Sequence, residues 1–242
     1  MLYRRLSEYF RFLKSLWRTV VRLIWGMWKL TALPHPAITI FGGSRVAVDS
    51  EIAKKTAQLT KLLAADGFSI ITGGGPGIME AANLGAMEHL KECEHNGVKC
   101  INHVVSAGIG LLRLNQDKVN PYVQKYIAME HFFSRKWLLV RYSVGFIVFP
   151  GGFGTLDELF EIVTLIQCNR MAKLPVILFD RLYWSPLIDW IETRAMKYKF
   201  IGESDAAIIY VTDSVQDAYE LIKKSCKEQK ESVLQNGFNG TK

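Results

Sequence analysis

The sequence lacks most of the features that mark metal-bound, secreted or disulfide-stabilised proteins. Only four of its 242 residues are cysteines: Cys93, Cys100, Cys168 and Cys226. They are far apart and form no Cys-x-x-Cys pair, so neither a zinc cage nor a disulfide framework is expected. His103 and His131 lack metal-ligand spacing. We therefore predict no metal, no cofactor and a cytoplasmic setting.

Internal repeats and low-complexity linkers are also absent. With 242 residues and 49% hydrophobic content, the chain is long enough for one α/β domain with a full core. One main domain is the default expectation.

Acidic residues are nearly absent from residues 1–33. This segment holds seven basic residues and the single acid Glu8, a net charge of +6 out of +7 for the whole chain. The rest of the chain is nearly neutral, which argues against nucleic acid as a partner. The chain therefore divides into a basic arm (residues 1–33) and a domain that begins after Pro34 and Pro36.

The arm has the pattern of a basic amphipathic helix over residues 3–30. Its charged residues recur at spacings of three, four or seven, and aromatic residues such as Trp17 and Trp28 lie on the other sides. No uncharged run reaches the roughly 18 residues of a spanning helix, and no small-residue cleavage site follows. Two interpretations stay open: peripheral membrane contact through residues 3–30, or docking on this domain or on a second subunit.

The domain (residues 34–226) alternates strand and helix patterns. Apolar strand-like runs at residues 37–41, 68–72 and 145–149 each end in a glycine turn that leads into a helical pattern. Further strands are expected at 100–105, 175–179 and 207–211, with helices near 183–196 and 214–226. This alternation predicts a doubly wound, mostly parallel, Rossmann-like sheet. The polar tail, residues 227–242, is expected to be disordered.

Two glycine turns are candidates for phosphate binding. Residues 73–77, Gly-Gly-Gly-Pro-Gly, open a helix, where backbone N–H groups and the helix dipole favour an anion. They lack the Gly-x-Gly-x-x-Gly dinucleotide spacing, and a turn needed only for packing is the alternative. Residues 150–155, Pro-Gly-Gly-Phe-Gly-Thr, have the same form, and Glu158 follows on the expected helix 155–166. Thr155 and Glu158 could also be a simple capping box.

The second turn carries a family resemblance. Pro-Gly-Gly-x-Gly-Thr-x-x-Glu resembles the signature of the LOG family, named from the plant "Lonely Guy" cytokinin-activating enzymes. The resemblance runs from about Ile38 to Ala218. It includes Gly42-Gly43-Ser44, residues 73–81, Ser134-Arg135-Lys136 and residues 183–187. Family members have often been labelled lysine decarboxylases, but no lysine lies in an obvious pyridoxal phosphate motif.

The resemblance implies a phosphoribohydrolase that releases a free base and ribose 5-phosphate from a nucleoside 5′-monophosphate without metal, in a protein that is commonly a homodimer. The catalytic residues of the family correspond to Arg135 and Glu158. The expected substrate-binding residues are Gly43, Ser44, Gly73, Gly74, Gly75, Gly77, Met79, Lys136, Gly151, Gly152, Gly154 and Thr155. The helix 132–142, with Trp137, Leu138 and Val140, is apolar enough for a dimer interface.

The chemistry fits these two roles. Cleavage of the bond from C1′ to the base develops positive charge on the ribose, which a carboxylate can stabilise while it orients or deprotonates water. We assign this role to Glu158. An arginine fork can hold ribose hydroxyls or phosphate and keep the carboxylate ionised, which is the role we expect for Arg135; a surface ion pair is the alternative.

One departure bears on specificity. Many plant members read Met-His-x-Arg-Lys where this chain has Phe132-Phe133-Ser134-Arg135-Lys136. Phe133 replaces the histidine, so we expect an unprenylated purine nucleotide such as AMP rather than a cytokinin nucleotide. Two other classes remain as alternatives: a nucleotide or cofactor carrier without turnover, and a membrane-recruited interaction protein.

Overall fold

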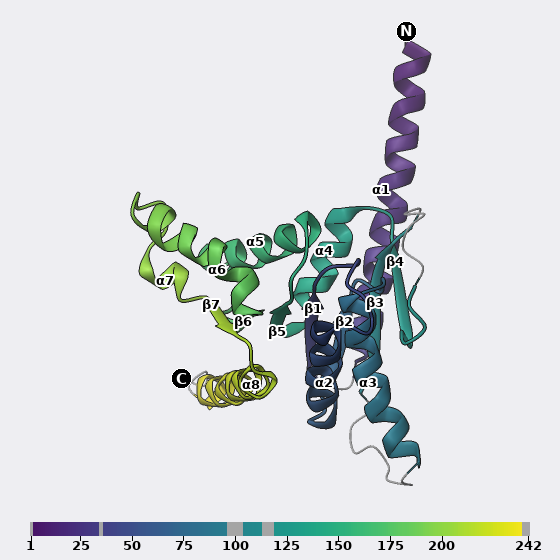
Figure 1. Cartoon of the computed structure of the whole chain (residues 1–242). Helices are drawn as coiled ribbons and strands as arrows, with labels where there is room; N and C mark the ends of the chain where they lie inside the picture. The colour runs from purple at the N-terminus through teal and green to yellow at the C-terminus, as the bar shows by residue number, and fades with distance from the viewer. Residues whose placement is uncertain (1, 34–35, 96–103, 113–118, 239–242) are drawn as a thin grey trace.

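The computed structural model describes residues 2–33, 36–95, 104–112 and 119–238, and its centre is one parallel sheet (Figure 1). The strand order is β4-β3-β2-β1-β5-β6-β7. The strands are β1 (Ala37–Phe41), β2 (Ser69–Thr72), β3 (Ser106–Leu111), β4 (Lys125–Met129), β5 (Ser143–Val148), β6 (Val176–Phe179) and β7 (Ile209–Thr212). Every neighbouring pair is parallel. The predicted doubly wound α/β fold is therefore confirmed.

Helices cover both faces of the sheet. They are α1 (Leu2–Thr31), α2 (Glu51–Ala65), α3 (Ile78–His95), α4 (Phe132–Arg141), α5 (Phe153–Gln167), α6 (Arg181–Trp190), α7 (Glu203–Ala206) and α8 (Val215–Phe238), with a π-helical segment Ile191–Met196 after α6. Side chains alternate between two cores along each strand. Phe146 and Val148 face α1, α4, α5 and α6, whereas Ile147 and Phe149 face α2, α3 and α8. Burial on both sides explains why the strands read as continuous apolar runs.

The strand order places the topological switch point between β1 and β5. From β1 the chain winds outward through β2 and β3 to the edge strand β4, then returns to β5 on the other side of β1. The loops that follow β1 and β5 therefore diverge at the carboxyl edge of the sheet. Doubly wound proteins bind ligands in the crevice formed there.

The predicted third strand was misplaced. The sequence predicted a strand at 100–105, of which 100–103 lie outside the described residues, whereas β3 begins at Ser106. Its sequence, Ser-Ala-Gly-Ile-Gly-Leu, has weak strand propensity. The glycines are nevertheless required, because neighbouring segments of the chain approach the strand closely. A Cβ added to Gly108 would lie 2.9 Å from Gly74 Cα, and a Cβ added to Gly110 would lie 2.0 Å from Tyr126 Oη. The short edge strand β4 was not predicted.

Three further expectations need correction. Helix α5 begins at Phe153, two residues earlier than predicted, with Gly152 as its N-cap. Helix α8 continues to Phe238, so residues 227–238 are helical where a disordered tail was expected; no glycine or proline interrupts this segment before Gly237. Cys93 is disulfide-bonded, whereas Cys168 and Cys226 are free. Spacing alone did not reveal that bond.

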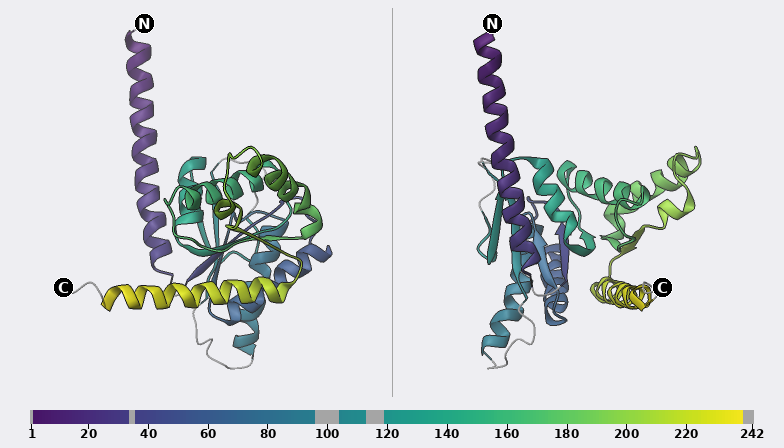
Figure 2. Two further views of the ribbon diagram at one scale, coloured as in Figure 1. Left: turned by 90° about the vertical axis from the view of Figure 1, so that its left-hand side faces the viewer. Right: turned by 180° about the vertical axis from the view of Figure 1, so that it is seen from behind.

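Helix α1 confirms the helical prediction for the arm. Its C-terminal half packs against α4 and β4, and its N-terminal half stands clear of the other elements in every view (Figure 2). Within the described ranges, no helix combines the length and apolarity needed to cross a membrane.

Candidate active site

A cavity of about 920 Å³ lies at the switch point of the sheet. The loop after β1 forms one side and the loop after β5, residues 150–155, forms the other; we call the latter the signature loop. Ten of the predicted site residues line this cavity: Gly43, Ser44, Gly73, Met79, Arg135, Gly151, Gly152, Gly154, Thr155 and Glu158. Residues from four separate parts of the chain thus meet where the topology predicts a ligand.

Glu158 is the buried carboxylate of the cavity. It lies in the second turn of α5 and is only 5% exposed. Within the described part of the chain its Oε2 atom has no hydrogen-bond partner. Burial raises the pKa of Glu158 to about 7, against the opposing effect of Arg135 and Lys136. Such a carboxyl group can exchange a proton near neutral pH.

These contacts exclude the capping box. Gly152, rather than Thr155, is the N-cap of α5, so Glu158 lies six residues into the helix from the cap. Its carboxylate makes no hydrogen bond to a backbone N–H among the described residues. The residue is buried without the local role that the alternative interpretation required.

Arg135 faces Glu158 across the cavity. Its Nη1 atom lies 3.8 Å from Glu158 Oε1, and its Nε donates a 2.8 Å hydrogen bond to the carbonyl of Ile109 in β3. An added Cβ at Gly73 would lie 2.3 Å from Arg135 Nη2, so a side chain at residue 73 would displace the guanidinium from this position. Arg135 is held inside the site and is not a surface pair partner.

The signature loop presents unused backbone donors to the cavity. Among the described residues, the N–H groups of Gly152, Phe153 and Gly154 donate to no protein acceptor. An added Cβ at Gly152 or Gly154 would meet nothing within 4 Å, so both glycines border open space beside the cavity that they line. They form the N-terminus of a 15-residue helix, which favours a bound anion.

Tyr183 holds the signature loop from the outside. Its hydroxyl donates a 2.5 Å hydrogen bond to the carbonyl of Gly151, and its side chain also lines the cavity. Close packing fixes the loop from the inside: an added Cβ at Gly151 would lie 2.1 Å from Thr155 Oγ1. The loop is therefore preorganised before any ligand binds.

Residues 73–77, which we call the second glycine loop, are bonded mainly to the protein. Gly74 N–H donates to Thr72 Oγ1 at 2.9 Å, and Asn120 Nδ2 donates to Gly75 O at 2.9 Å. Buried Asn83 completes the network: its Oδ1 accepts from Thr72 and Asn120, and its Nδ2 donates to Ser106. Gly74, Gly75 and Gly77 do not line the cavity.

Gly77 is needed for packing between the loops. Its φ is +71°, a region that side chains rarely adopt, and an added Cβ would lie 2.4 Å from Gly43 O. Ile78 N–H donates to the same carbonyl at 3.1 Å. The packing interpretation therefore fits this loop best, except at Gly73. The reason is position, since β2 lies one strand away from the switch point.

Lys136 also lies away from the cavity. Its Nζ atom pairs with Asp157 at 2.7 Å and with Glu161 at 2.9 Å, which joins α4 to α5. Burial alone would lower the pKa of Lys136, but the hydrogen bonds to the two carboxylates raise it above its ordinary value. The structure therefore places Lys136 in a structural ion pair with Asp157 and Glu161.

The lining residues that sequence reasoning missed include Arg45, Phe132 and Tyr183. Arg45 forms no ion pair within the described residues and lies on the loop after β1. Phe132 rather than Phe133 reaches the cavity, because Phe133 stacks on His131 at a ring-centroid distance of 5.6 Å. Phe133, on which the expectation of an unprenylated purine rested, therefore does not line this cavity. Arg45 could have been predicted as a site residue from its position in the loop after β1.

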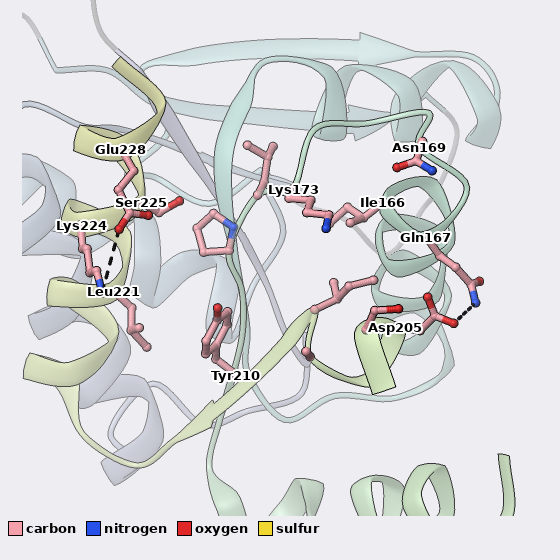
Figure 3. Close-up of a pocket in the computed structure, with 15 residues that line it drawn as sticks. Ile166, Gln167, Asn169, Lys173, Asp205, Tyr210, Leu221, Lys224, Ser225 and Glu228 are labelled. Carbon is pink, nitrogen blue, oxygen red and sulfur yellow. Dashed lines mark hydrogen bonds and ion pairs between the residues drawn. The ribbon is translucent and has the colours of Figure 1, made fainter. Parts of the chain in front are cut away.

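A second cavity, of about 610 Å³, lies at the opposite edge of the sheet (Figure 3). It is bounded by the end of α5, the approach to β7 and the face of α8, with Lys173, Tyr210 and Lys224 on its walls. It lies at the amino ends of β6 and β7 and contains none of the predicted site residues. The glycine-loop cavity is therefore the candidate active site.

Comparisons with known proteins identify the family of the chain. A family model described as "Possible lysine decarboxylase" matches residues 79–222, more than half of the chain. The chain is 28% identical over 187 residues to cytokinin riboside 5′-monophosphate phosphoribohydrolase LOG4 of Arabidopsis thaliana, covering 77% of this chain and 80% of that protein. The LOG protein of Oryza sativa subsp. japonica is 26% identical over 187 residues, covering 77% and 71%.

Solved structures share the fold. A molybdenum cofactor binding protein from Rippkaea orientalis superposes with a TM-score of 0.55 at 25% identity, covering 78% of this chain and 96% of that one. A molybdenum cofactor carrier protein from Chlamydomonas reinhardtii gives a TM-score of 0.55 at 20% identity, covering 79% and 98%. At 20% identity the second match speaks to the fold alone.

Proposed function

The chain belongs to the family described as possible lysine decarboxylases, which includes the LOG proteins, and from that premise we propose that it is a nucleoside 5′-monophosphate phosphoribohydrolase. It would release a free base and ribose 5-phosphate. The observation that carries the proposal is the buried Glu158 carboxylate facing Arg135, in a cavity lined by an anion-binding helix N-terminus.

Glu158 acts on the water and on the ribose. As the bond from C1′ to the base breaks, the ribose gains positive charge that a nearby carboxylate stabilises. The same carboxylate accepts a proton from the attacking water, and a pKa of about 7 suits that exchange at neutral pH. Its unpartnered Oε2 is the atom available to substrate or water.

Arg135 and the signature loop bind the rest of the nucleotide. Phosphate accepts from the free N–H groups of Gly152, Phe153 and Gly154 at the positive end of α5. Arg45 supplies a cation on the facing loop. Arg135, held by Ile109, binds ribose hydroxyls and favours the ionised form of Glu158.

For the base, we propose an unprenylated purine, with AMP as the first candidate. Phe133 stands where plant members have a histidine, so this part of α4 departs from their pattern even though Phe133 itself does not line the cavity. Phe132 and Phe153 are exposed at the mouth of the cavity and offer aromatic faces on which a base can stack.

The test is product formation. Purified protein is incubated with AMP, GMP, CMP, UMP and isopentenyladenosine monophosphate, and free base is measured by chromatography beside the Glu158→Gln variant. We expect adenine from AMP and none above background from the variant. Full activity in Glu158→Gln would refute the mechanism, and preference for the prenylated nucleotide would refute the AMP assignment.

A carrier without turnover is the second candidate, favoured by the 25% identity to a molybdenum cofactor binding protein. The same loops would hold a phosphate-bearing ligand without cleaving it. Nucleotide binding in calorimetry with no free base from any substrate would replace the enzyme with the carrier.

We also propose a homodimer, with an interface that differs from the one predicted. Leu138 and Val140 are buried in the protomer's own core, so they are not available to a partner. The exposed residues Phe132, Phe133 and Trp137 remain on the same helix beside the cavity. Light scattering on the wild type and on a Phe133→Ser variant measures the mass; a monomeric wild type would exclude the dimer.

A further inference from the structure

Helix α1 docks on the domain through its less apolar side. Residues at spacings of three or four form this docked face: Ser15, Thr19, Arg22, Leu23, Gly26 and Leu30. Ser15 Oγ lies 3.2 Å from His131 Nε2, and Arg22 donates to Ala128 O at 3.1 Å. Arg18 pairs with Glu130. These contacts fix the helix along the β4 edge.

The close approach also fixes the rotation of the helix. An added Cβ at Gly26 would lie 2.7 Å from Leu138 Cδ1 and 3.3 Å from Ile127 Cγ2, so the helix backbone lies directly on the core. Since the docked face is set by these contacts, the other faces of α1 must point away from the domain.

A continuous apolar stripe lies on the side turned to solvent. We call it the outer face: Phe10, Leu13, Trp17, Val20, Val21, Ile24 and Trp28, each 40–71% exposed. The members recur every three or four residues and extend over about 27 Å of helix. Isolated exposed apolar side chains are ordinary, but a contiguous stripe of this size marks an interaction site.

Basic side chains border the outer face. Arg11, Lys14 and Lys29, at spacings of three and fifteen, lie along one edge of the stripe. Arg18 lies on the same edge but pairs with Glu130 of the domain. Lys29 Nζ lies 4.0 Å from the centroid of the Trp25 ring, so a cation and an aromatic ring already share this edge. The arm's single acid is Glu8.

The charge along the outer face of α1 indicates whether a lipid bilayer or a second copy of this chain covers it. Two copies packed through the outer face would bring two basic edges together without acidic partners to neutralise them. An anionic bilayer supplies both hydrocarbon for the apolar stripe and negative charge for its basic edge. Tryptophan at positions 17, 25 and 28 also prefers the boundary between headgroups and acyl chains.

We propose that α1 lies in the surface of an anionic phospholipid membrane through its outer face, while its docked face holds the catalytic domain beside that membrane. The inference is independent of the proposed reaction, since it rests on no residue of the cavity. It also accounts for a helix whose more apolar side is left uncovered by its own domain.

The test is vesicle co-sedimentation of the full chain. We expect at least about tenfold more binding to vesicles that contain phosphatidylglycerol than to phosphatidylcholine alone. The triple variant Trp17→Ser, Ile24→Ser, Trp28→Ser should lose binding to both. Arg11→Gln with Lys14→Gln should lose most of the preference for anionic vesicles.

The matched control removes two exposed apolar residues from another part of the domain, Leu182→Ser with Phe200→Ser, and should bind like the wild type. Circular dichroism and thermal unfolding verify that each variant folds. Equal sedimentation of wild type and triple variant would overturn the proposal. So would absence of vesicle binding together with a self-association that the triple variant abolishes, because the occupant would then be a second copy.

Discussion

The two glycine-rich turns of this protein have nearly the same sequence character and different roles. Both follow a parallel strand and open a helix. The second glycine loop is held by hydrogen bonds within the protein, which involve Thr72, Asn83 and Asn120. The signature loop leaves its N–H groups free and faces the cavity. The difference follows from strand position, because only the signature loop lies at the switch point.

The largest difference between a change at the signature loop and a change at the second glycine loop should appear in kcat. Glu158→Gln removes the carboxylate that accepts the proton from water and stabilises the positive charge on the ribose, so we expect kcat to fall by about 10²- to 10⁴-fold. Asn83→Ala, which damages the support of the second glycine loop, should lower the free energy of unfolding by about 1–3 kcal/mol and leave kcat within about tenfold of wild type. Steady-state kinetics and urea unfolding measure the two effects. A greater kcat loss in Asn83→Ala would give both loops a catalytic role.

Single glycines should separate packing from ligand binding. Gly77→Ala forces a side chain into a left-handed backbone and against Gly43 O, so we expect a loss of about 2–4 kcal/mol in stability. Gly154→Ala meets open space and adds helix propensity, so stability should hold or rise by up to about 1 kcal/mol. Its methyl group should instead weaken nucleotide binding, measured by calorimetry. A large stability loss in Gly154→Ala would contradict the open-loop description.

The pH dependence of stability should identify Glu158. Its folded-state pKa of about 7 lies above the ordinary 4.5, so between those values the folded protein holds a proton that the unfolded chain has released. The free energy of unfolding should therefore fall as pH rises from about 4.5 to 7, by at most about 3 kcal/mol.

The Glu158→Gln variant should lack this loss and be more stable than wild type at pH 8, with little difference at pH 4.5. Asp189→Asn, at an exposed carboxylate that forms no ion pair within the described residues, is the control. Parallel stability profiles for wild type and Glu158→Gln, measured by thermal unfolding across this range, would contradict the raised pKa.

The smallest effect should come from the outer support of the signature loop. Tyr183→Phe removes the hydrogen bond to Gly151 O while keeping the ring, so we expect about 1 kcal/mol or less in stability. A two- to fivefold rise in KM with little change in kcat should accompany it, because the loop becomes less ordered. A kcat loss as large as that of Glu158→Gln would make Tyr183 a catalytic residue.

The prediction of the candidate site was most accurate where a sequence motif also lies at the topological switch point of the sheet. Arg135, Glu158 and the signature loop meet as expected. Lys136 did not reach the cavity, since adjacent helix residues point in different directions and Lys136 faces Asp157 and Glu161 instead. Asn83 carried no local signal, because its importance lies in partners from β2, β3 and the segment before β4.

By itself, the sequence determined the α/β class, the glycine turns, the candidate pair Arg135 and Glu158, and the separation of a basic helical arm from a nearly neutral domain. These are properties of period, composition and local turn chemistry. Tertiary structure decided which glycine loop faces the cavity, that Glu158 is buried with a raised pKa, and which side of α1 is covered. Each of these depends on contacts between distant segments, because burial and desolvation are set by what packs against a residue and not by its neighbours in the chain.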